Sequence, residues 1–511
     1  MNKFQLTVKM KNLFLIFIIF LNLPFLCESA KVLLTVMDQG RSHATSITPL
    51  MHRLQKDGHL TALEMATYKK DMDFGMAERF INMSGFENHF ISKDFFKIAF
   101  EDEFTFVHQA VPFFFGSISC NRILKHQKER WMEIANENWD LFLSDSLFSP
   151  CGYAMAEITG KPHVMMHSSD VESAHGTFKG FSRNYALMVP NFLPYSMSNF
   201  TTDKWWHRVI STVDWFGSMF ITGGVAGFAQ KWALRSIIPF PYFSFYDYNR
   251  RSSFSFTDMP DPLYPVGART NDYFSFGTYC NPPKNQLTEE WAEFVNAPES
   301  KGTILVAFGT IIDWRFAPEE KFEIFLNVLN KLTDYRVVWS MKGERPDGLM
   351  THVKVSSWVP QQLILNHEKT VLFVSHGGLK SVKEAVCSAT PSIFMPMFGE
   401  QMRNAWLAKS KGFARILNKF HLSESYLENH IREVVEHKSY QTNAEHFLST
   451  FADSPMPALD EAAFKFKRLF KYNGKMPKYF YPKAIDLSYI ETLNLDFWVL
   501  IPLILCWLVS N

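Results

Sequence analysis

The sequence predicts an α/β protein with two doubly wound domains. Short apolar runs, typical of buried strands, alternate along the chain with segments of helical periodicity. This alternation is typical of parallel sheets covered by helices. The 511 residues are enough for two cores, and 47% hydrophobic and 20% charged residues is the composition of a globular protein. The net charge of +1 gives no reason to expect nucleic acid as a partner.

The first element is a predicted signal peptide, residues 1–29. Three lysines precede the apolar run LFLIFIIFLNLPFL at residues 13–26, and the small residues Cys27 and Ser29 suit cleavage after Ser29. A non-cleaved anchor is the alternative, but the run is shorter than a membrane span requires. A cleaved signal would send the chain into the secretory lumen.

The first domain is expected at residues 30–285. Short apolar runs predict strands at residues 31–37, 139–145 and 162–168. A polar loop is expected to lead into a helix at residues 47–59, where apolar residues share one face. Residues 240–300 have little periodicity and many Pro, Gly, Ser and aromatic residues, so we place the domain junction near residues 281–300.

The second domain is expected at residues 286–450, where strands and helices alternate more clearly. Strands are predicted at residues 303–309, 335–341, 352–358, 369–375 and 391–397, and helices at residues 318–332, 361–367 and 401–414. The ligand crevice of such a doubly wound domain lies at the carboxyl ends of its strands.

The last element is a predicted membrane span, residues 493–509. Every residue from Phe497 to Val509 is apolar, but a helix of 17 residues reaches only about 25 Å, and a hydrocarbon core measures about 30 Å. The basic residues nearby precede the segment, which opposes the positive-inside bias. Translocation of a whole domain can override that bias. A C-terminal helix buried in the globule is the alternative.

Entry into the secretory lumen would allow glycosylation at two sequons and disulfide formation among four cysteines. Asn82 and Asn199 each begin an Asn-X-Ser/Thr glycosylation sequence. Besides Cys27 and Cys506 at the two ends, the cysteines are Cys120, Cys151, Cys280 and Cys387. They allow a bridge between Cys120 and Cys151 without requiring it, and no Cys/His cluster predicts a metal site.

Polar clusters follow three strands of the second domain. Ser375-His376-Gly377-Gly378 lies between a strand and a helix, where glycines allow a ligand to approach the backbone and the helix N-terminus attracts anions. Trp358-Val359-Pro360-Gln361 comes about fifteen residues earlier, and Glu400-Gln401 follows the next strand. Carboxyl ends of parallel strands share one edge, so the three clusters should converge on one crevice.

These motifs resemble the signature of the UDP-glucuronosyl/UDP-glucosyltransferase family. The resemblance covers W-V-P-Q at 358–361, F-V-S-H-G-G at 373–378, E-A at 384–385 and F-G-E-Q-x-x-N-A at 398–405. It implies the GT-B architecture of two facing Rossmann-like domains, with helices at residues 451–490 crossing back to the first. It also implies an endoplasmic reticulum membrane protein whose catalytic domains are lumenal.

The same resemblance assigns the UDP-sugar contacts. It implies that Trp358 and Gln361 hold uracil, that Glu384 holds the ribose, and that Glu400 and Gln401 hold the sugar hydroxyls. The diphosphate is expected against His376, Gly378, Lys380 and Ser381, with Gly309 and Thr310 bordering it.

Three departures from the family pattern bear on the donor. Lys380 stands where many members have Asn, and would pair with phosphate or face solvent. Glu400 replaces the usual Asp, and Asp261 lies where glucuronosyl members often carry an arginine. A sugar donor that carries a carboxylate needs a cation beside it. The sequence instead places acids at Asp261 and Glu400, and besides Lys380 the cation expected nearby is Arg403. We therefore predict UDP-glucose rather than UDP-glucuronate as co-substrate.

The resemblance places the chemistry on the first domain. His43 matches the family's catalytic base, which removes the proton of an acceptor hydroxyl, and Asp145 matches its partner. The helix N-terminus is expected to keep the His43 ring neutral. Attack on the anomeric carbon would invert it, and this scheme needs no metal or cofactor. A small lipophilic acceptor is expected in a pocket built from residues 60–250.

Other functions stay open at this point. A sugar-nucleotide epimerase, or a glycosyltransferase acting on another glycan, would keep the fold and change the reaction. A catalytically silent UDP-sugar-binding membrane protein would keep the binding site alone. The presence of both His43 and Asp145 argues for an enzyme. The sequence leaves the oligomeric state open, including a homo-oligomer.

Overall fold

The computed structural model describes most of the chain after the predicted signal. The described residues are 29–36, 41–67, 73–83, 93–181, 185–239, 245–264, 269–281, 283, 285–492 and 494–510. Residues 1–28 of the predicted signal peptide lie outside them, as do Ser84 of the first sequon and Leu493 of the predicted span.

The first sheet has seven strands among the described residues, all parallel, in the order β3-β2-β1-β4-β5-β6-β7. The strands are β1 (Lys31–Thr35), β2 (Leu60–Thr67), β3 (Ala77–Asn82), β4 (Leu141–Asp145), β5 (His163–His167), β6 (Ser255–Thr257) and β7 (Tyr273–Ser275). The three predicted strands are confirmed. The sequence did not indicate β6 and β7, because three residues are too few to show a periodicity.

Helices follow or connect these strands: α2 (Arg41–Lys56), α4 (Ala110–His126), α5 (Lys128–Ala135), α6 (Pro150–Thr159), α7 (Ser173–Phe178), α8 (Trp205–Phe220), the π-helical turn η4 (Ile221–Ala226), α9 (Gly227–Leu234) and α10 (Phe245–Arg251). Short 3₁₀ turns are η1 (Phe106–Gln109), η2 (Tyr185–Leu187) and η3 (Tyr195–Met197). Helix α2 starts six residues earlier than predicted. Its first turn is polar, and the Thr45 and Ser46 hydroxyls donate to the Ser42 carbonyl, so apolar spacing could not reveal it.

The second sheet has six parallel strands in the order β10-β9-β8-β11-β12-β13. They are β8 (Thr303–Ala307), β9 (Arg336–Ser340), β10 (Val353–Ser356), β11 (Thr370–Ser375), β12 (Ser392–Phe394) and β13 (Ala414–Ile416). The five predicted strands are confirmed. The prediction of a helix to residue 414 was wrong, because Gly412 at φ +81° ends that helix and β13 follows.

The helices of the second domain are α11 (Glu289–Val295), α12 (Glu319–Lys331), α13 (Gln361–Leu365), α14 (Leu379–Cys387), α15 (Gln401–Ser410), α16 (Glu424–Glu436) and α17 (Lys438–Ala452), with the turn η5 (Trp314–Phe316). Helix α3 (Lys93–Glu101) belongs to the first half of the sequence but packs on this domain. Its Phe96 ring stacks on Phe316 at 4.9 Å, and its Phe100 is buried in the core of the second sheet. The two halves of the chain are therefore joined by the packing of α3 as well as by the linker between the domains.

The chain returns to the first domain after α17. Helix α18 (Ala458–Lys471) packs along α2. Phe466 stacks on Phe256 of β6 at 4.7 Å, and Arg53 of α2 donates a hydrogen bond to Asp460. The turns η6 (Lys478–Phe480) and η7 (Lys483–Asp486) then lead to α19 (Tyr489–Thr492).

Two disulfides join distant segments. Cys120 of α4 is bonded to Cys151 of α6, the bridge that the sequence allowed. Cys280 is bonded to Cys387 at the end of α14, a pairing that the sequence did not indicate. The second bridge ties the segment between the domains to the helix that follows the SHGG motif.

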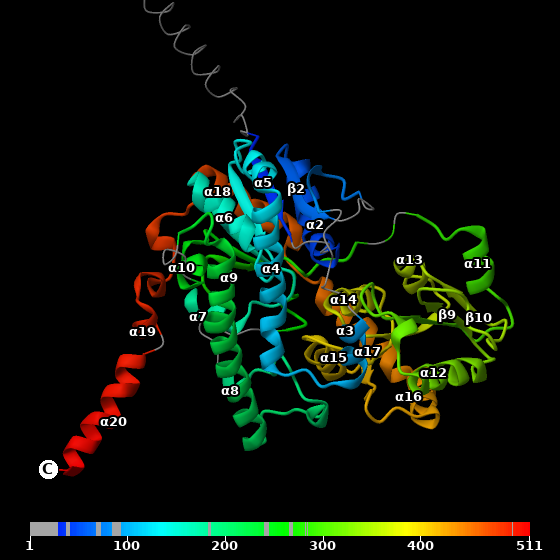
Figure 1. The fold of residues 1–511 in the computed structure, drawn as a ribbon. Coiled ribbons are helices and arrows are strands. Elements are labelled where there is room, and N and C mark those ends of the chain that lie inside the picture. Colours follow the sequence, from blue (N-terminus) through cyan, green and yellow to red (C-terminus); the bar gives the residue numbers. More distant parts are fainter. Residues whose placement is uncertain are drawn as a thin grey trace, which may run out of the picture.

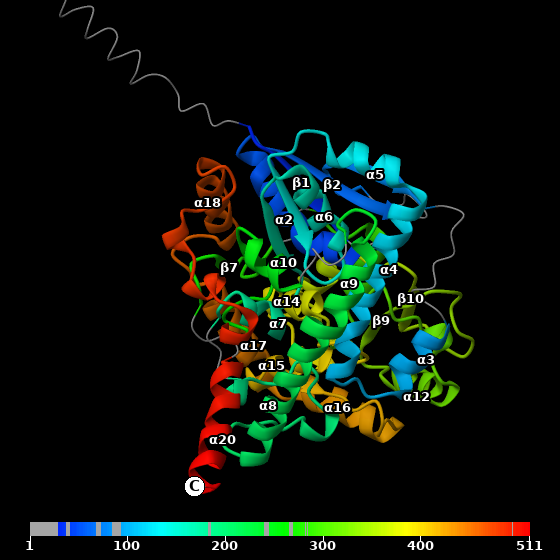
Figure 2. The same ribbon diagram turned by 60° about the vertical axis from the view of Figure 1, so that its left-hand side comes forward.

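The C-terminal helix α20 (Leu495–Ser510) projects from the molecule. Its apolar side chains are exposed, among them Trp498, Leu503 and Trp507, so the alternative of a helix buried in the globule is wrong. Among the described residues, one helical stretch, Trp205–Leu234, has the length and hydropathy to cross a membrane. Figures 1 and 2 show α8, the first part of that stretch, extending toward the same end of the molecule as α20.

Candidate active site

The two sheets present their topological switch points to one another. The strand order reverses between β1 and β4 in the first sheet and between β8 and β11 in the second. His43 follows β1 and Asp145 ends β4, while Gly309 follows β8 and His376 follows β11. Switch points are where ligands bind in doubly wound folds. The predicted catalytic pair and the predicted diphosphate site thus occupy equivalent places in the two domains.

Two contacts connect these edges across the cleft. The Lys380 ammonium donates a hydrogen bond of 2.6 Å to the Thr45 hydroxyl, two residues beyond His43 on α2. The Lys383 ammonium lies 2.6 Å from Asp258, which directly follows β6. The Lys380 ammonium thus reaches the first domain rather than solvent, and its contact with phosphate stays a prediction.

The His43 ring lies against Asp145 in the first turn of α2. Nδ1 is 2.7 Å from Oδ2 of Asp145 and also 2.7 Å from the Ser168 hydroxyl. Oδ2 of Asp145 approaches Nδ1 without the alignment of a hydrogen bond. The carboxylate oxygen of Asp145 and the hydroxyl oxygen of Ser168 therefore both contact the same ring nitrogen. Phe148 packs edge-on to the ring at 4.7 Å. Nε2 has no hydrogen bond with a described residue, which leaves it free to accept a proton.

The charge around His43 favours its protonated form. Burial lowers the pKa of His43, but the charge and close contact of Asp145, with smaller contributions from Glu400 and Glu172, outweigh burial and raise the pKa. The expectation of a ring kept neutral by the helix N-terminus is wrong in direction. A raised pKa makes the imidazole a stronger base and stabilises the imidazolium formed by proton transfer.

Glu172 and Ser168 are site residues that the sequence did not reveal. Glu172 is buried, 3.3 Å from Nδ1 of His167 and 2.9 Å from Nδ1 of His175. Burial raises the pKa of Glu172, but the two histidines outweigh burial and hold it below its usual value. Ser168 follows β5 at the same sheet edge as Asp145. Its position as the last residue of the predicted strand at 162–168 was the one available signal.

On the other side of the cleft, His376 lies between two glycines. A Cβ at Gly309 would come within 2.8 Å of the His376 ring, and a Cβ at Gly378 within 2.6 Å. Gly377 takes the positive φ of +80° that turns the chain into α14. Burial lowers the pKa of His376 to about 4, so the ring is a neutral hydrogen-bonding group at physiological pH. The paired glycines make room for the ring and for a ligand.

The residues assigned to uracil and ribose lie together. The Gln361 amide donates to one oxygen of Glu384, and the Gln362 amide donates to the other at 3.2 Å. Trp358 is 70% exposed at the end of β10, which leaves its indole face open for stacking. Of the diphosphate residues, Thr310 is exposed after β8 and Ser381 is buried on α14.

The residues assigned to the sugar begin α15. The side-chain oxygen Oε1 of Gln401 accepts hydrogen bonds from the backbone N–H groups of Met397 (2.8 Å) and Phe398 (3.1 Å), so it fixes the loop before the helix. The negative charge of Glu400 contributes to the raised pKa of His43 across the cleft. Arg403 is 2% exposed, 3.8 Å from Asp170, and donates to the Asn191 amide oxygen.

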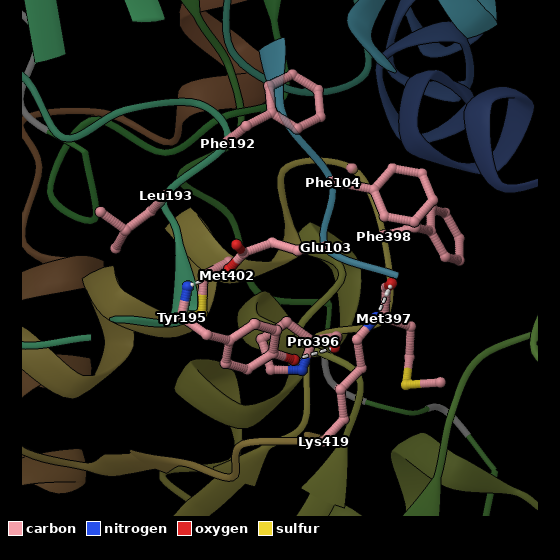
Figure 3. A pocket seen from close by; sticks show the side chains of 11 residues that line it. Glu103, Phe104, Phe192, Leu193, Tyr195, Pro396, Met397, Phe398, Met402 and Lys419 are labelled. Atoms are coloured by element: carbon pink, nitrogen blue, oxygen red, sulfur yellow. Dashed lines mark hydrogen bonds between the residues drawn. The ribbon is translucent and has the colours of Figure 1, made fainter. Parts of the chain in front are cut away.

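A small cavity lies where the two domains contact each other, and it is too small to be a substrate pocket. It measures about 20 Å³, room for about one water. Figure 3 shows side chains from both halves around it; Tyr195 donates to the Pro396 carbonyl and its own N–H donates to Glu103. The Lys419 ammonium donates to the carbonyls of Met397 (2.8 Å) and Ala99 (2.6 Å). Burial lowers the pKa of Lys419 to about 7.

Comparison with known proteins identifies the family. The family model described as "UDP-glucoronosyl and UDP-glucosyl transferase" matches residues 29–509. The chain belongs to this family. It is 25% identical over 506 residues to human UDP-glucuronosyltransferase 1A1, covering 93% of this chain and 88% of the relative. It is 31% identical over 239 residues to rabbit UDP-glucuronosyltransferase 2B13, covering 47% of this chain and 43% of the relative.

Solved structures agree with the fold. Os79 from O. sativa in complex with UDP has a TM-score of 0.57 at 14% identity, covering 86% of this chain and all of that chain. The glycotransferase of kitacinnamycin has a TM-score of 0.57 at 15% identity, covering 86% of this chain and 99% of that chain. These neighbours confirm the prediction of a GT-B fold with two Rossmann-like sheets.

Proposed function

We propose that the protein is an inverting UDP-glycosyltransferase that moves a hexose to a hydroxyl of a small lipophilic acceptor. The acceptor O–H proton passes to Nε2 of His43, and the oxygen forms a bond to the anomeric carbon. The bond from that carbon to the UDP oxygen breaks, and UDP leaves with the electron pair. The observation that carries this proposal is the His43–Asp145 pair facing the SHGG turn across one cleft.

The donor side fits a leaving group that gains negative charge. The N-terminus of α14 and the neutral His376 ring offer hydrogen-bond donors to the diphosphate. Trp358 and Gln361 would hold uracil, Glu384 the ribose, and Glu400 the sugar hydroxyls. Lys380 would exchange its Thr45 contact for a phosphate when the donor binds.

We infer that UDP-glucose is preferred to UDP-glucuronate. The cations around the cleft named so far already have partners: Lys380 with Thr45, Lys383 with Asp258, Arg403 with Asp170 and Asn191, and Arg269 with Asp261. Lys342 donates to the Thr310 carbonyl. Glu400 adds negative charge that acts on His43. A hexuronate carboxylate there would be left without a cation, which is costly.

The experiment combines activity and donor choice. UDP release is followed with a panel of lipophilic phenols, with UDP-glucose and UDP-glucuronate competing at equal concentration. Glucoside as the main product supports both parts. Glucuronide as the main product would overturn the donor assignment alone. Binding of UDP without transfer to any acceptor would favour a silent binder.

We also propose that the protein is held in the endoplasmic reticulum membrane with its domains in the lumen. Two disulfides support an oxidising compartment, and the sequon residues Asn82 and Asn199 are exposed. Helix α20 has 16 residues, about 24 Å, so it is short for a span. The exposed aromatic side chains of α8, Trp205, Trp206 and Phe220, offer a second apolar contact with the lipid.

Deletion of residues 493–511, followed by carbonate extraction, tests the anchor. The truncated chain is expected in the soluble fraction and the full chain in the pellet. A full-length chain that is already soluble would show that α20 is not a span. A truncated chain that stays on membranes until Trp205 and Trp206 are also replaced by serine would assign the remaining affinity to α8.

A further inference from the structure

A second, larger cavity lies at the amino ends of β5 and β6, the edge of the first sheet opposite the edge that faces the catalytic cleft. It measures about 590 Å³ and is lined from the end of α6, the start of β5, the end of α10 and residues 475–486. Strand β5 runs from His163 at this cavity to His167, and Ser168 just beyond it contacts His43. The two sites are thus separated by the length of this strand, roughly 15 Å.

The cavity has an excess of positive charge. Five cations and two carboxylates line it: Lys161, Arg250, Arg251, Lys475 and Lys478, with Glu157 and Asp486. Arg251 pairs with Glu157 at 2.8 Å and Lys478 with Asp486 at 3.2 Å, which uses both carboxylates. Lys161 and Lys475 have no carboxylate partner among the described residues. Two ammonium groups without a carboxylate partner therefore share one hollow with the Arg250 guanidinium, which lies 3.2 Å from Asp247 and donates to the Leu487 carbonyl.

A buried histidine in the wall lacks partners. His163 is 4% exposed, and neither of its ring nitrogens has a hydrogen-bond partner in the described part of the chain. Its ring packs against Tyr153 at 5.4 Å and Tyr248 at 5.5 Å. Burial, with a contribution from Lys179, lowers the pKa of His163 to about 3, so the ring is neutral and offers one donor and one acceptor. Buried polar groups are normally paired, which points to a bound group.

One side of the wall is largely apolar, and the volume of the cavity suits a small molecule. Met476, Tyr481 and Ile485 line the side made by the returning chain. A volume of 590 Å³ is within the range of about 300–1,000 Å³ typical of ligand pockets. Asp486 at the rim is followed after two residues by α19, which leads to α20. The wall made by residues 475–486 is therefore close in sequence to the predicted membrane segment, and Figure 1 shows α19 leading into α20.

We propose that this cavity is a second ligand site, which binds a phosphate monoester through Lys161, Arg250 and Lys475, with an apolar or polyol body against Met476, Tyr481 and Ile485. A phosphate monoester carries nearly two negative charges and several acceptors, which matches two free ammonium groups and one guanidinium. The ligand of this second site is either a soluble phosphorylated metabolite or the headgroup of an anionic phospholipid, since both present a phosphate monoester. The site is independent of the proposed transferase reaction.

Calorimetric titration of the full chain in neutral detergent tests the proposal. UDP is kept saturating, so that the catalytic cleft is occupied. The two probes are glycerol 3-phosphate and dihexanoyl phosphatidic acid, which differ by two acyl chains. Binding of both with similar affinity identifies a soluble ligand. Binding of the acylated probe alone identifies a phospholipid headgroup.

Matched variants locate the binding. Lys161→Gln/Lys475→Gln is expected to weaken the binding probe at least tenfold, and His163→Phe, which keeps the ring packing, several-fold. The control Lys128→Gln/Lys438→Gln removes the same charge from exposed positions elsewhere and should change affinity less than twofold. The absence of saturable binding of either probe, or binding that survives in both cavity variants, overturns the proposal.

Discussion

His43 and His376 occupy equivalent places in the two domains and have opposite acid–base properties. Each follows a strand at the switch point of its sheet and faces the same cleft. The pKa of His43 is raised, because Asp145 and more distant carboxylates outweigh burial. The pKa of His376 falls to about 4, because burial acts without a carboxylate to oppose it. Topology brings both imidazoles to the ligand, and the neighbouring side chains decide what each can do.

The difference separates a base from a binding group. His43 has Nδ1 against Asp145 and a free Nε2, the arrangement of an imidazole that accepts a proton and keeps it. His376 lies between Gly309 and Gly378, close to the backbone turn that would receive a diphosphate. Substitutions at His43 should therefore lower kcat, and substitutions around His376 should raise KM for the donor.

The largest effect is expected for His43→Ala. Loss of the base should reduce kcat on the order of 10³-fold or more, because the acceptor hydroxyl is a poor nucleophile without proton removal. UDP affinity, measured by calorimetry, should stay within twofold of wild type, since the donor residues lie on the other domain. Activity within tenfold of wild type would end the assignment of His43 as the base.

Asp145→Asn should lower kcat nearly as much, on the order of 10²-fold or more, by leaving the imidazole misoriented and its cation unstabilised.

The same variant should also shift the pH dependence of the rate in a defined direction. His43 must be neutral to accept a proton, so a raised pKa places the acid limb of the wild-type rate profile above the ordinary histidine value of 6.5. Removing the Asp145 charge leaves burial, which lowers the pKa, so the limb should move to lower pH. A limb that stays in place would show that another group titrates there.

The donor half could be predicted from the sequence because its signals are local. Each polar cluster directly follows an apolar run, so Trp358, His376 and Glu400 could be placed at one sheet edge from spacing alone. The structure places them at the ends of β10, β11 and β12 or just beyond. Glycine 412 shows the limit of this approach, since one positive φ turned the end of a predicted helix into a new strand.

The catalytic half could be predicted only in part. His43 and Asp145 were assigned by resemblance, and their pairing was expected. The pKa of His43 is raised mainly by Asp145, with smaller contributions from Glu400 and Glu172, which lie far away in sequence. The position of α3 on the second domain and the Cys280–Cys387 bridge are likewise tertiary contacts that no periodicity records. Pairing across the cleft, such as Lys380 with Thr45, depends on how the domains face each other.

A smaller effect is expected for Gly378→Ala, which tests the His376 side of the comparison. Gly378 has φ −59°, so its backbone tolerates alanine, but the new Cβ would lie 2.6 Å from Nε2 of His376. The displaced ring should raise KM for the UDP-sugar roughly tenfold, about 1.4 kcal/mol, with kcat changed less. Gly224→Ala is the matched control, since its Cβ would lie 3.9 Å from the Phe220 ring, an ordinary van der Waals contact. Equal KM in the two variants would remove His376 from the diphosphate site.

The smallest effect is expected for Trp358→Ala. The indole is 70% exposed in the unliganded protein, so its removal should leave the thermal unfolding temperature within about 1 °C of wild type. Loss of stacking on uracil should weaken UDP and UDP-sugar by the same factor, roughly five- to tenfold, about 1 kcal/mol. Because UDP lacks the hexose, an equal loss for both ligands assigns Trp358 to the nucleotide. A loss confined to the UDP-sugar would instead place the indole against the hexose, on the side of the cleft that faces His43.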